Sequence, residues 1–312
     1  MPYLWEMLQS LQDQTCQDFE VFVWDNGSTD GSIEMLQKWI PKRLPGHVFT
    51  EEPLSLGLSL RRLVEESRSE YCARMDADDV CLPNRLQVQL DFLRKHPQFK
   101  LVGSERECMD SQGRTTEPRT MLPLKTHDIL HATLRAPRLL HPSVVFERSA
   151  ILDAGNYQDL SSRENPYWCE DYDMWLRLLA RHDVVAIPDK LLRYRYHEAS
   201  LTERETRLKR TSDAKRLAWL HNAGSFAGIL DPEVAASLWD RKLRFARPEL
   251  IRIARHFQKK DGIPVKDRLQ MKSFQDVIGT MIKSGDVLTR FWHKWLRSRS
   301  TTGSYSNSSL FT

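Results

Sequence analysis

Strand-like and helix-like patterns alternate along the first 200 residues, and this alternation constrains the fold more than any other feature of the sequence. Leu4, Met7 and Leu11 recur at the spacing of one helix face. The apolar run at 19–24 then has the length and composition of a strand. Such alternation predicts an α/β fold in which helices cover a mostly parallel central sheet. The expected helices are 4–14, 33–39, 60–67 and 84–95, and the expected strands are 19–24 and 70–75.

Polar side chains follow both expected strands. Asp25 and Asn26 follow the first, and Asp76 and Asp78 follow the second and project to the same side. Ligands of open α/β sheets bind beyond the carboxyl ends of the strands, so these positions favour a nucleotide site. Paired carboxylates repel each other unless a cation or a ribose hydroxyl satisfies them, and Mg²⁺ and Mn²⁺ prefer oxygen ligands. The alternative is an acidic turn in which Asp79 caps the next helix.

The composition is that of a globular chain, with 312 residues of which 40% are apolar and 28% charged. Its five cysteines never occur at CxxC spacing, which argues against a disulfide framework and against a zinc site. No run of about 18 apolar residues occurs, and the first residues lack the basic flank and apolar stretch of a signal peptide. We therefore expect a cytoplasmic protein that at most lies on the inner face of the membrane.

Charge divides the chain near residue 200. Residues 1–200 carry 24 Lys and Arg against 31 Asp and Glu, a net charge of −7, whereas residues 201–312 carry 22 against 11, a net charge of +11. The alternating patterns stop at the same point, and charged helical patterns follow. We expect an α/β domain at 1–200, a helical basic region at 201–297 and a disordered tail at 298–312.

One basic amphipathic segment spans residues 282–299. Leu288, Phe291 and Trp295 recur on one helix face, and basic side chains line the other. This pattern is typical of a helix that lies in a membrane surface, with aromatic rings among the headgroups and cations near anionic lipid. The alternative is a helix whose aromatic face packs on the α/β domain. Nucleic acid is not an expected partner, because no nucleic-acid-binding module accompanies the charge.

Four motifs follow one another along the first 200 residues. They are WDNGSTDGS at 24–32, ARMDADD with LPNRL at 73–86, HPSVVF at 141–146 and EDYDMWLRL at 170–178. Together they resemble family 2 glycosyltransferases, especially the bacterial members that build surface polysaccharides. The resemblance covers roughly residues 3–200. It implies a GT-A type nucleotide-binding domain, a nucleotide-sugar donor, and a divalent metal, Mn²⁺ or Mg²⁺, at the DXD motif.

Two departures from the family pattern stand near the start of the domain. Members usually begin with an apolar strand just before the helix expected at 4–14, and this sequence shows no such strand. We therefore expect a catalytic domain that lacks its first strand. Many members also have an Asp where this chain has Asn26, whose side-chain carbonyl can accept from a pyrimidine N–H.

The resemblance assigns metal and nucleotide roles to the matching positions. Asp78 would ligate a cation that bridges the two phosphates and neutralises the departing nucleoside diphosphate. Asp76 would contact the ribose or the same cation, and His197 stands where some related enzymes close the metal site. The residues assigned to the nucleotide sugar are Asp25, Asn26, Arg74 and Asp76.

Asp171 is the expected general base. The resemblance implies an inverting transfer, and a single displacement needs one carboxylate to take the proton of the acceptor hydroxyl. Asp171 opens a predicted helix whose dipole favours an anion, and the same position also suits a simple helix cap. Glu170 is the second candidate for the base, and Asp173 is expected to be solvated or paired with Arg177.

These inferences predict a metal-dependent glycosyltransferase. It would move a hexose from a UDP-sugar to a glycan or lipid-linked acceptor in polysaccharide biosynthesis, as a peripheral membrane enzyme. The alternative is a non-catalytic or weakly active glycosyltransferase-like binding or scaffold protein, which the lost first strand would suit. A nucleotidyltransferase would need a Gly-rich triphosphate loop near the start, and the sequence has none there. The sugar, the linkage and the acceptor depend on pocket shape and do not follow from the motifs.

Overall fold

The computed structural model describes residues 2–116, 129, 133, 139–159, 170–179 and 181–200. These residues all belong to the first of two compact units, Met1–Gly228 and Ile229–Thr312. The predicted helical region at 201–297, its segment 282–299 and the predicted tail at 298–312 lie outside the described residues. The division of the chain near residue 200 therefore stays a prediction.

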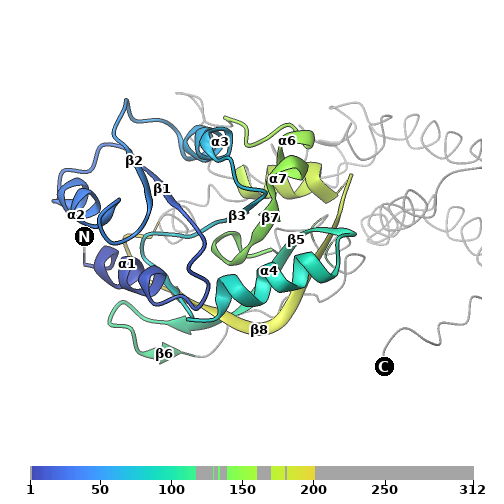
Figure 1. Ribbon diagram of the computed structural model, residues 1–312. Helices are drawn as coiled ribbons and strands as arrows, with labels where there is room; N and C mark the ends of the chain where they lie inside the picture. Colours follow the sequence, from blue (N-terminus) through green and yellow to red (C-terminus); the bar gives the residue numbers. More distant parts are fainter. Residues whose placement is uncertain are drawn as a thin grey trace, which may run out of the picture. The chain divides into compact units, whose positions relative to one another are not determined.

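The N-terminal part combines two helices with a small parallel sheet (Figure 1). Its elements are α1 (Leu4–Gln12), β1 (Val21–Trp24), α2 (Ser32–Trp39) and β2 (Gly46–Phe49), with Val21 opposite Gly46 and Trp24 opposite Phe49. Apolar side chains of α1 and α2 pack on one face of the two strands. A Cβ on Gly46 would lie 1.9 Å from the Val21 carbonyl oxygen, so only glycine allows this close pairing.

A second, six-stranded sheet carries most of the remaining core. Its strands are β3 (Tyr71–Ala73), β7 (Val145–Glu147), β5 (Phe99–Met109), β8 (Asp183–Arg195) and β4 (Val80–Cys81), in that order, with β6 (Thr115–Thr116) paired to β5. β5 and β8 pair in parallel over most of their length. Apolar residues from β5, β7 and β8 form a core with helix α4 (Arg85–Lys95), which crosses this sheet in Figure 1.

The α/β class is confirmed, and the long parallel pairing of β5 with β8 is joined by short antiparallel pairings. β7 lies between β3 and β5 and runs antiparallel to both, and β4 is antiparallel to β8. The central sheet is therefore mixed, because strand direction depends on how the chain returns to the sheet and not on the local pattern. Among the described strands, none joins β1 to β3, so the two sheets are separate.

The remaining helices surround the edge of the sheet that bears β3 and β7. They are α3 (Leu56–Glu66), the short 3₁₀ turn η1 (His141–Ser143), α6 (Arg148–Asp153) and α7 (Glu170–Leu179). α3 begins four residues before the expected start at 60, because the Ser55 hydroxyl caps it by accepting the N–H of Leu58 at 3.3 Å. Within the described part of the chain, no helix is long and apolar enough to cross a membrane.

Candidate active site

Three carboxylates gather in the loop between β3 and β4. Asp76, Asp78 and Asp79 can each offer one oxygen, and these oxygens lie within 4.8 Å of one another. Asp76 forms an ion pair with Arg74, and a hydrogen bond of 2.8 Å joins Oδ2 of Asp78 to Nε2 of His197. The loop therefore brings together four of the residues that the sequence assigned to the metal and the nucleotide.

Asp79 is the most enclosed of the three acids, with 1% of its surface exposed. Its Oδ1 accepts the backbone N–H of Arg195 at 2.8 Å. Its Oδ2 is also buried, and no described residue donates a hydrogen bond to it. Burial, together with the charges of Asp76 and Asp78, raises the pKa of Asp79 well above its ordinary value. The expected alternative, that Asp79 caps the next helix, is wrong, because α4 begins after Asn84.

This donor set fits a divalent cation. A buried carboxylate oxygen without a hydrogen bond is costly unless a ligand supplies a partner. The Asp79 oxygen lies in a cluster of carboxylates, which are the ligands that Mg²⁺ and Mn²⁺ prefer. From the sequence, Asp79 was not assigned to the metal. Its burial is the signal that only the structure supplies.

Arg195 holds the acidic loop in place from the end of β8. Its Nε donates to the Asp78 carbonyl oxygen at 2.7 Å, and its guanidinium carbon lies 4.3 Å from the centre of the Tyr3 ring. Glu6 on α1 also pairs with this guanidinium. Because Arg195 is 2% exposed, its contacts fasten the loop to α1 and β8.

Arg85 supports the same loop from α4. Its Nη2 donates to the Arg74 carbonyl oxygen at 2.7 Å, and its Nε donates to the Gln89 side chain at 3.1 Å. The side chain is 1% exposed, so these bonds are made inside the core. A buried hydrogen bond to the residue that opens the loop fixes where the three acids begin.

Asp25 and Asn26 stand at the end of β1, as expected. The Asp25 carboxylate accepts the backbone N–H groups of Gly27 and Ser28, each at 2.9 Å. Burial raises the pKa of Asp25, but the side chain of Ser28 together with these two backbone hydrogen bonds outweighs burial, and the pKa is lowered overall. The Asn26 side-chain oxygen accepts from the Leu54 N–H at 3.0 Å and from the Ser59 hydroxyl at 3.1 Å. Accepting a pyrimidine N–H there would require one of these two bonds to break.

Glu170 and Asp171 occupy the first turn of α7, where the helix dipole favours anions. Glu170 is buried, whereas Asp171 is half-buried and accepts the Tyr172 N–H at 2.6 Å. Asp173 is fully buried and pairs with Arg177, whose Nε lies 3.0 Å from Oδ2. The expected Asp173–Arg177 pair is confirmed, and the alternative of a solvated Asp173 is wrong.

The surroundings of Glu170 set its proton affinity. Burial, followed by the negative charge of Asp171, raises the pKa of Glu170 to about 8. Nδ1 of His141 lies 3.7 Å from its Oε1. The positive charge of Arg74 lowers the proton affinity of both Asp76, in the acidic loop, and Glu170, on α7. The two groups of acids therefore share one nearby guanidinium.

Comparison with known proteins identifies the family of this chain. The model of glycosyl transferase family 2 matches residues 1–147. A relative from Erwinia amylovora, named amylovoran biosynthesis glycosyltransferase AmsE, is 31% identical over 192 residues, which are 61% of this chain and 69% of the relative. A UDP-Gal:alpha-D-GlcNAc-diphosphoundecaprenol beta-1,3-galactosyltransferase from Escherichia coli is 27% identical over 180 residues, 57% of this chain and 62% of that protein.

Solved structures show the same fold. Residues 1–349 of S. aureus TarS in complex with UDP-GlcNAc align with a TM-score of 0.57 at 15% identity, over 90% of this chain and 77% of that one. The mannosyltransferase PcManGT from Pyrobaculum calidifontis, in complex with GDP-Man and Mn²⁺, aligns with a TM-score of 0.54 at 16% identity, over 96% and 83%. The expected GT-A fold is thereby confirmed, and this chain belongs to glycosyl transferase family 2.

Proposed function

We propose that this chain transfers a sugar from a UDP-sugar to a glycan or lipid-linked acceptor in polysaccharide biosynthesis, with a divalent metal and with inversion. The observation that carries the proposal is the buried, unpartnered Asp79 oxygen within the carboxylate cluster. The Escherichia coli relative is named for a UDP-galactose donor and a diphosphoundecaprenol-linked acceptor, and TarS binds UDP-GlcNAc in its solved structure, which supports both parts of the proposal.

The acidic loop is the part that would receive the diphosphate of the donor. Asp76, Asp78 and Asp79 would hold the metal, and His197 lies against Asp78 at its edge. A bound Mn²⁺ or Mg²⁺ supplies positive charge that stabilises the departing nucleoside diphosphate. Asp25 and Asn26 at the end of β1 are the residues assigned to the nucleotide base of the donor. Arg74 forms an ion pair with Asp76 and can fix the orientation of that carboxylate.

Asp171 is the better candidate for the general base. With a pKa of about 8, the Glu170 carboxyl is mostly protonated at neutral pH and cannot readily take a proton. Asp171 is half-buried at the same helix end and can face an acceptor hydroxyl. As the hydroxyl oxygen attacks the anomeric carbon, its proton passes to the Asp171 carboxylate and the bond to the UDP oxygen breaks.

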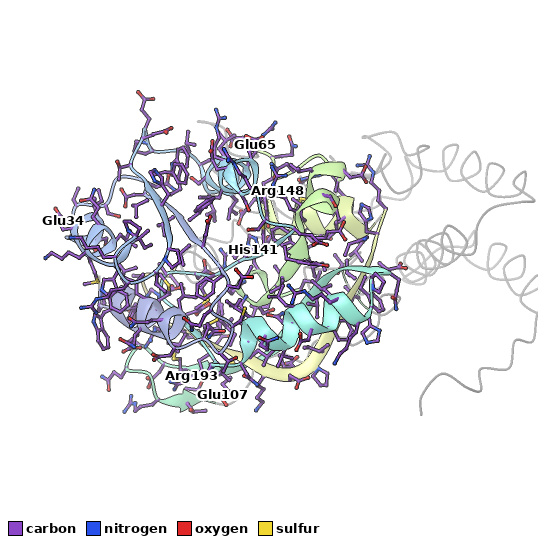
Figure 2. All side chains as sticks on the ribbon, in the orientation of Figure 1. Glu34, Glu65, Glu107, His141, Arg148 and Arg193 are labelled. Carbon is purple, nitrogen blue, oxygen red and sulfur yellow. The ribbon has the colours of Figure 1, made fainter. Side chains whose placement is uncertain are left out.

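Isothermal titration of the full chain with UDP, in the presence and absence of Mn²⁺, tests the donor and metal parts. We expect binding that requires Mn²⁺ and is lost in Asp78→Asn. The matched control is Glu34→Gln, which changes an exposed acid on α2 at the periphery of Figure 2 and should bind UDP normally. Equal UDP binding with and without Mn²⁺ would contradict the proposed metal site. No UDP binding under either condition would contradict the proposed UDP-sugar donor.

Product configuration tests the base and the inversion. UDP-galactose and UDP-GlcNAc are offered with a synthetic GlcNAc-diphospho-lipid, and the anomeric coupling in the product is read by NMR. Inversion is expected, and Asp171→Asn should lower kcat by about a hundredfold or more. A retained anomeric configuration, or an unchanged kcat in Asp171→Asn, would contradict the assignment.

A further inference from the structure

His141 lies in the interior of the described unit, on η1, with 6% of its surface exposed (Figure 2). Its Nε2 is 2.9 Å from the Tyr157 hydroxyl, and its ring meets the Trp175 ring edge-on at 5.5 Å between centres. Its other nitrogen, Nδ1, lies 3.7 Å from Oε1 of the Glu170 carboxyl group. The two nitrogens therefore face two different polar groups, and the surrounding rings fix which nitrogen faces which.

The turn after α6 places the Tyr157 hydroxyl next to this histidine. Gly155 and Asn156 both have positive φ, at 88° and 56°, and the Asn156 side chain accepts the Tyr157 N–H at 2.8 Å. The Asn156 amide also donates to the Arg61 carbonyl oxygen of α3 at 3.2 Å. A non-glycine residue held at positive φ needs such support, so the position of the tyrosine is well determined.

The same turn is bound to the last turn of α7. Arg177, which pairs with Asp173 inside the core, donates from Nη1 to the Ala154 carbonyl oxygen. These contacts lead from Arg177 through the turn and Tyr157 to His141, whose Nδ1 comes within 3.7 Å of the Glu170 carboxyl group. They therefore connect the last turn of α7 with its first turn.

We propose that His141 is a positioning residue, which through Glu170 places the first turn of α7 so that Asp171 meets the acceptor hydroxyl. This inference rests on the proposed function, because it assigns a task to the helix end that carries the base. His141 touches neither donor nor acceptor in this scheme. It acts by holding the carboxyl next to the base within the narrow range of positions that a displacement allows.

A role for His141 as the base itself does not suit its surroundings. Burial, and next the nearby charge of Arg74, lower the pKa of His141 well below its ordinary value. The ring is also enclosed by Tyr157 and Trp175. The charged and titratable groups that act on Glu170 come from the acidic loop, η1, the turn after α6 and α7 itself: Arg74, Asp76, His141, Tyr157 and Asp171.

Two amide substitutions separate positioning from packing. The amide of His141→Asn stands near the former Nδ1 and can still reach toward Glu170, whereas that of His141→Gln stands near Nε2 and can still reach Tyr157. Release of UDP from UDP-GlcNAc and from UDP-galactose is measured with Mn²⁺ and with the synthetic GlcNAc-diphospho-lipid as acceptor. We expect His141→Gln to lose roughly ten- to a hundredfold in kcat, His141→Asn to lose less, and KM and UDP affinity to change less than about twofold.

The order of the two variants decides between the roles. A packing role predicts that the larger Gln is tolerated at least as well as Asn, and that order would overturn the proposal. A loss confined to KM or to UDP affinity would overturn it too. His182→Asn is the matched control, because His182 also contacts a carboxylate, Asp153 at 3.0 Å, but outside the site. Its kcat should equal that of the wild type.

A second measurement needs no activity. Urea midpoints are compared for His141→Gln, which gives up the contact to Glu170, for Glu170→Gln, for the double variant and for the wild type. Tyr157→Phe, which only removes a hydroxyl, is paired with Glu170→Gln in a second cycle. A contact between His141 and Glu170 predicts that the two single changes in stability do not add in the double variants, and additive changes would overturn the inference. If the wild type fails to bind UDP, the proposed function fails. The urea midpoints still report whether His141 and Glu170 are coupled.

Discussion

At the scale of single residues, burial gives each acid of the site a different task. Asp78 contacts His197 and Asp76 pairs with Arg74, so each has a polar side-chain partner. Asp79 has its backbone contact to Arg195 and one oxygen that no described residue satisfies. A group held in this way weakens the fold and strengthens a cation site, which is the usual exchange between stability and function.

Asp79→Asn separates these two effects. The amide keeps an oxygen for the Arg195 N–H and removes a carboxylate whose folded pKa is raised by burial. Because a raised folded pKa weakens the fold as pH rises, the metal-free variant should melt roughly 2–4 °C above the wild type at pH 8. Added Mn²⁺ should raise the melting temperature of the wild type only, and a melting temperature below that of the metal-free wild type would contradict this account.

Glu170 gives stability a pH dependence of known sign. Its pKa is about 8 in the folded chain, against an unfolded value of about 4.3. Between these values the folded chain holds more protons than the unfolded chain, so this group makes stability fall as pH rises. Urea midpoints from pH 5 to 9 should therefore fall less steeply in Glu170→Gln than in the wild type. Parallel profiles would show that Glu170 titrates normally.

At the scale of elements, α7 is the part that the site depends on most. Its first turn carries both candidate acids, and its third turn carries the Arg177 that reaches the α6 turn. The helix is buried on nearly all sides, in keeping with its mostly apolar sequence between the charged positions. A helix fixed at two points can present a carboxyl end with little freedom to move.

The two i,i+4 pairs of opposite charge on α7 and α3 allow a direct comparison. Arg177→Met leaves the fully buried Asp173 without its partner and should cost about 3–5 kcal/mol of unfolding free energy. Arg61→Met breaks a pair with Glu65 whose side chains are 42% and 34% exposed, and should cost less than about 1 kcal/mol. Urea denaturation measures both, and equal costs would show that the buried pair does not fasten α7.

At the scale of the whole molecule, the negative first part and the basic remainder suit different surroundings. Residues 1–200 carry the site with a net charge of −7, while residues 201–312 carry +11. The segment at 282–299 lies outside the described residues, and its membrane role stays a proposal that the sequence pattern supports.

Vesicle flotation tests that proposal. The full chain should bind vesicles that contain phosphatidylglycerol, less so at high salt, because the attraction is between cations and anionic lipid. Trp292→Ala with Trp295→Ala should reduce the bound fraction several-fold. The control is Trp5→Ala, which removes a tryptophan of α1 that is 53% exposed. A similar loss with either change, or salt-independent binding, would contradict a role for this segment.

Local patterns predicted the parts of the fold that depend on near neighbours. Helices α1, α2 and α4 and strands β1 and β3 fall at the expected places, within a few residues. Apolar spacing, turns and caps act within a few residues of one another, so a single sequence contains them. Strand directions could not be predicted, because β7 pairs with β3 and β5 although both lie far before it in the sequence.

The sequence by itself determined the α/β class, the acids that follow β3 and the pair of acids that opens α7, because each is a run of adjacent residues. Tertiary structure alone decided that Asp79 is buried with an unsatisfied oxygen, and that His141, Tyr157 and Glu170 meet across segments far apart in the chain. The physical reason is that burial and proton affinity depend on which segments pack around a group. Packing is a property of the whole fold and not of any local pattern.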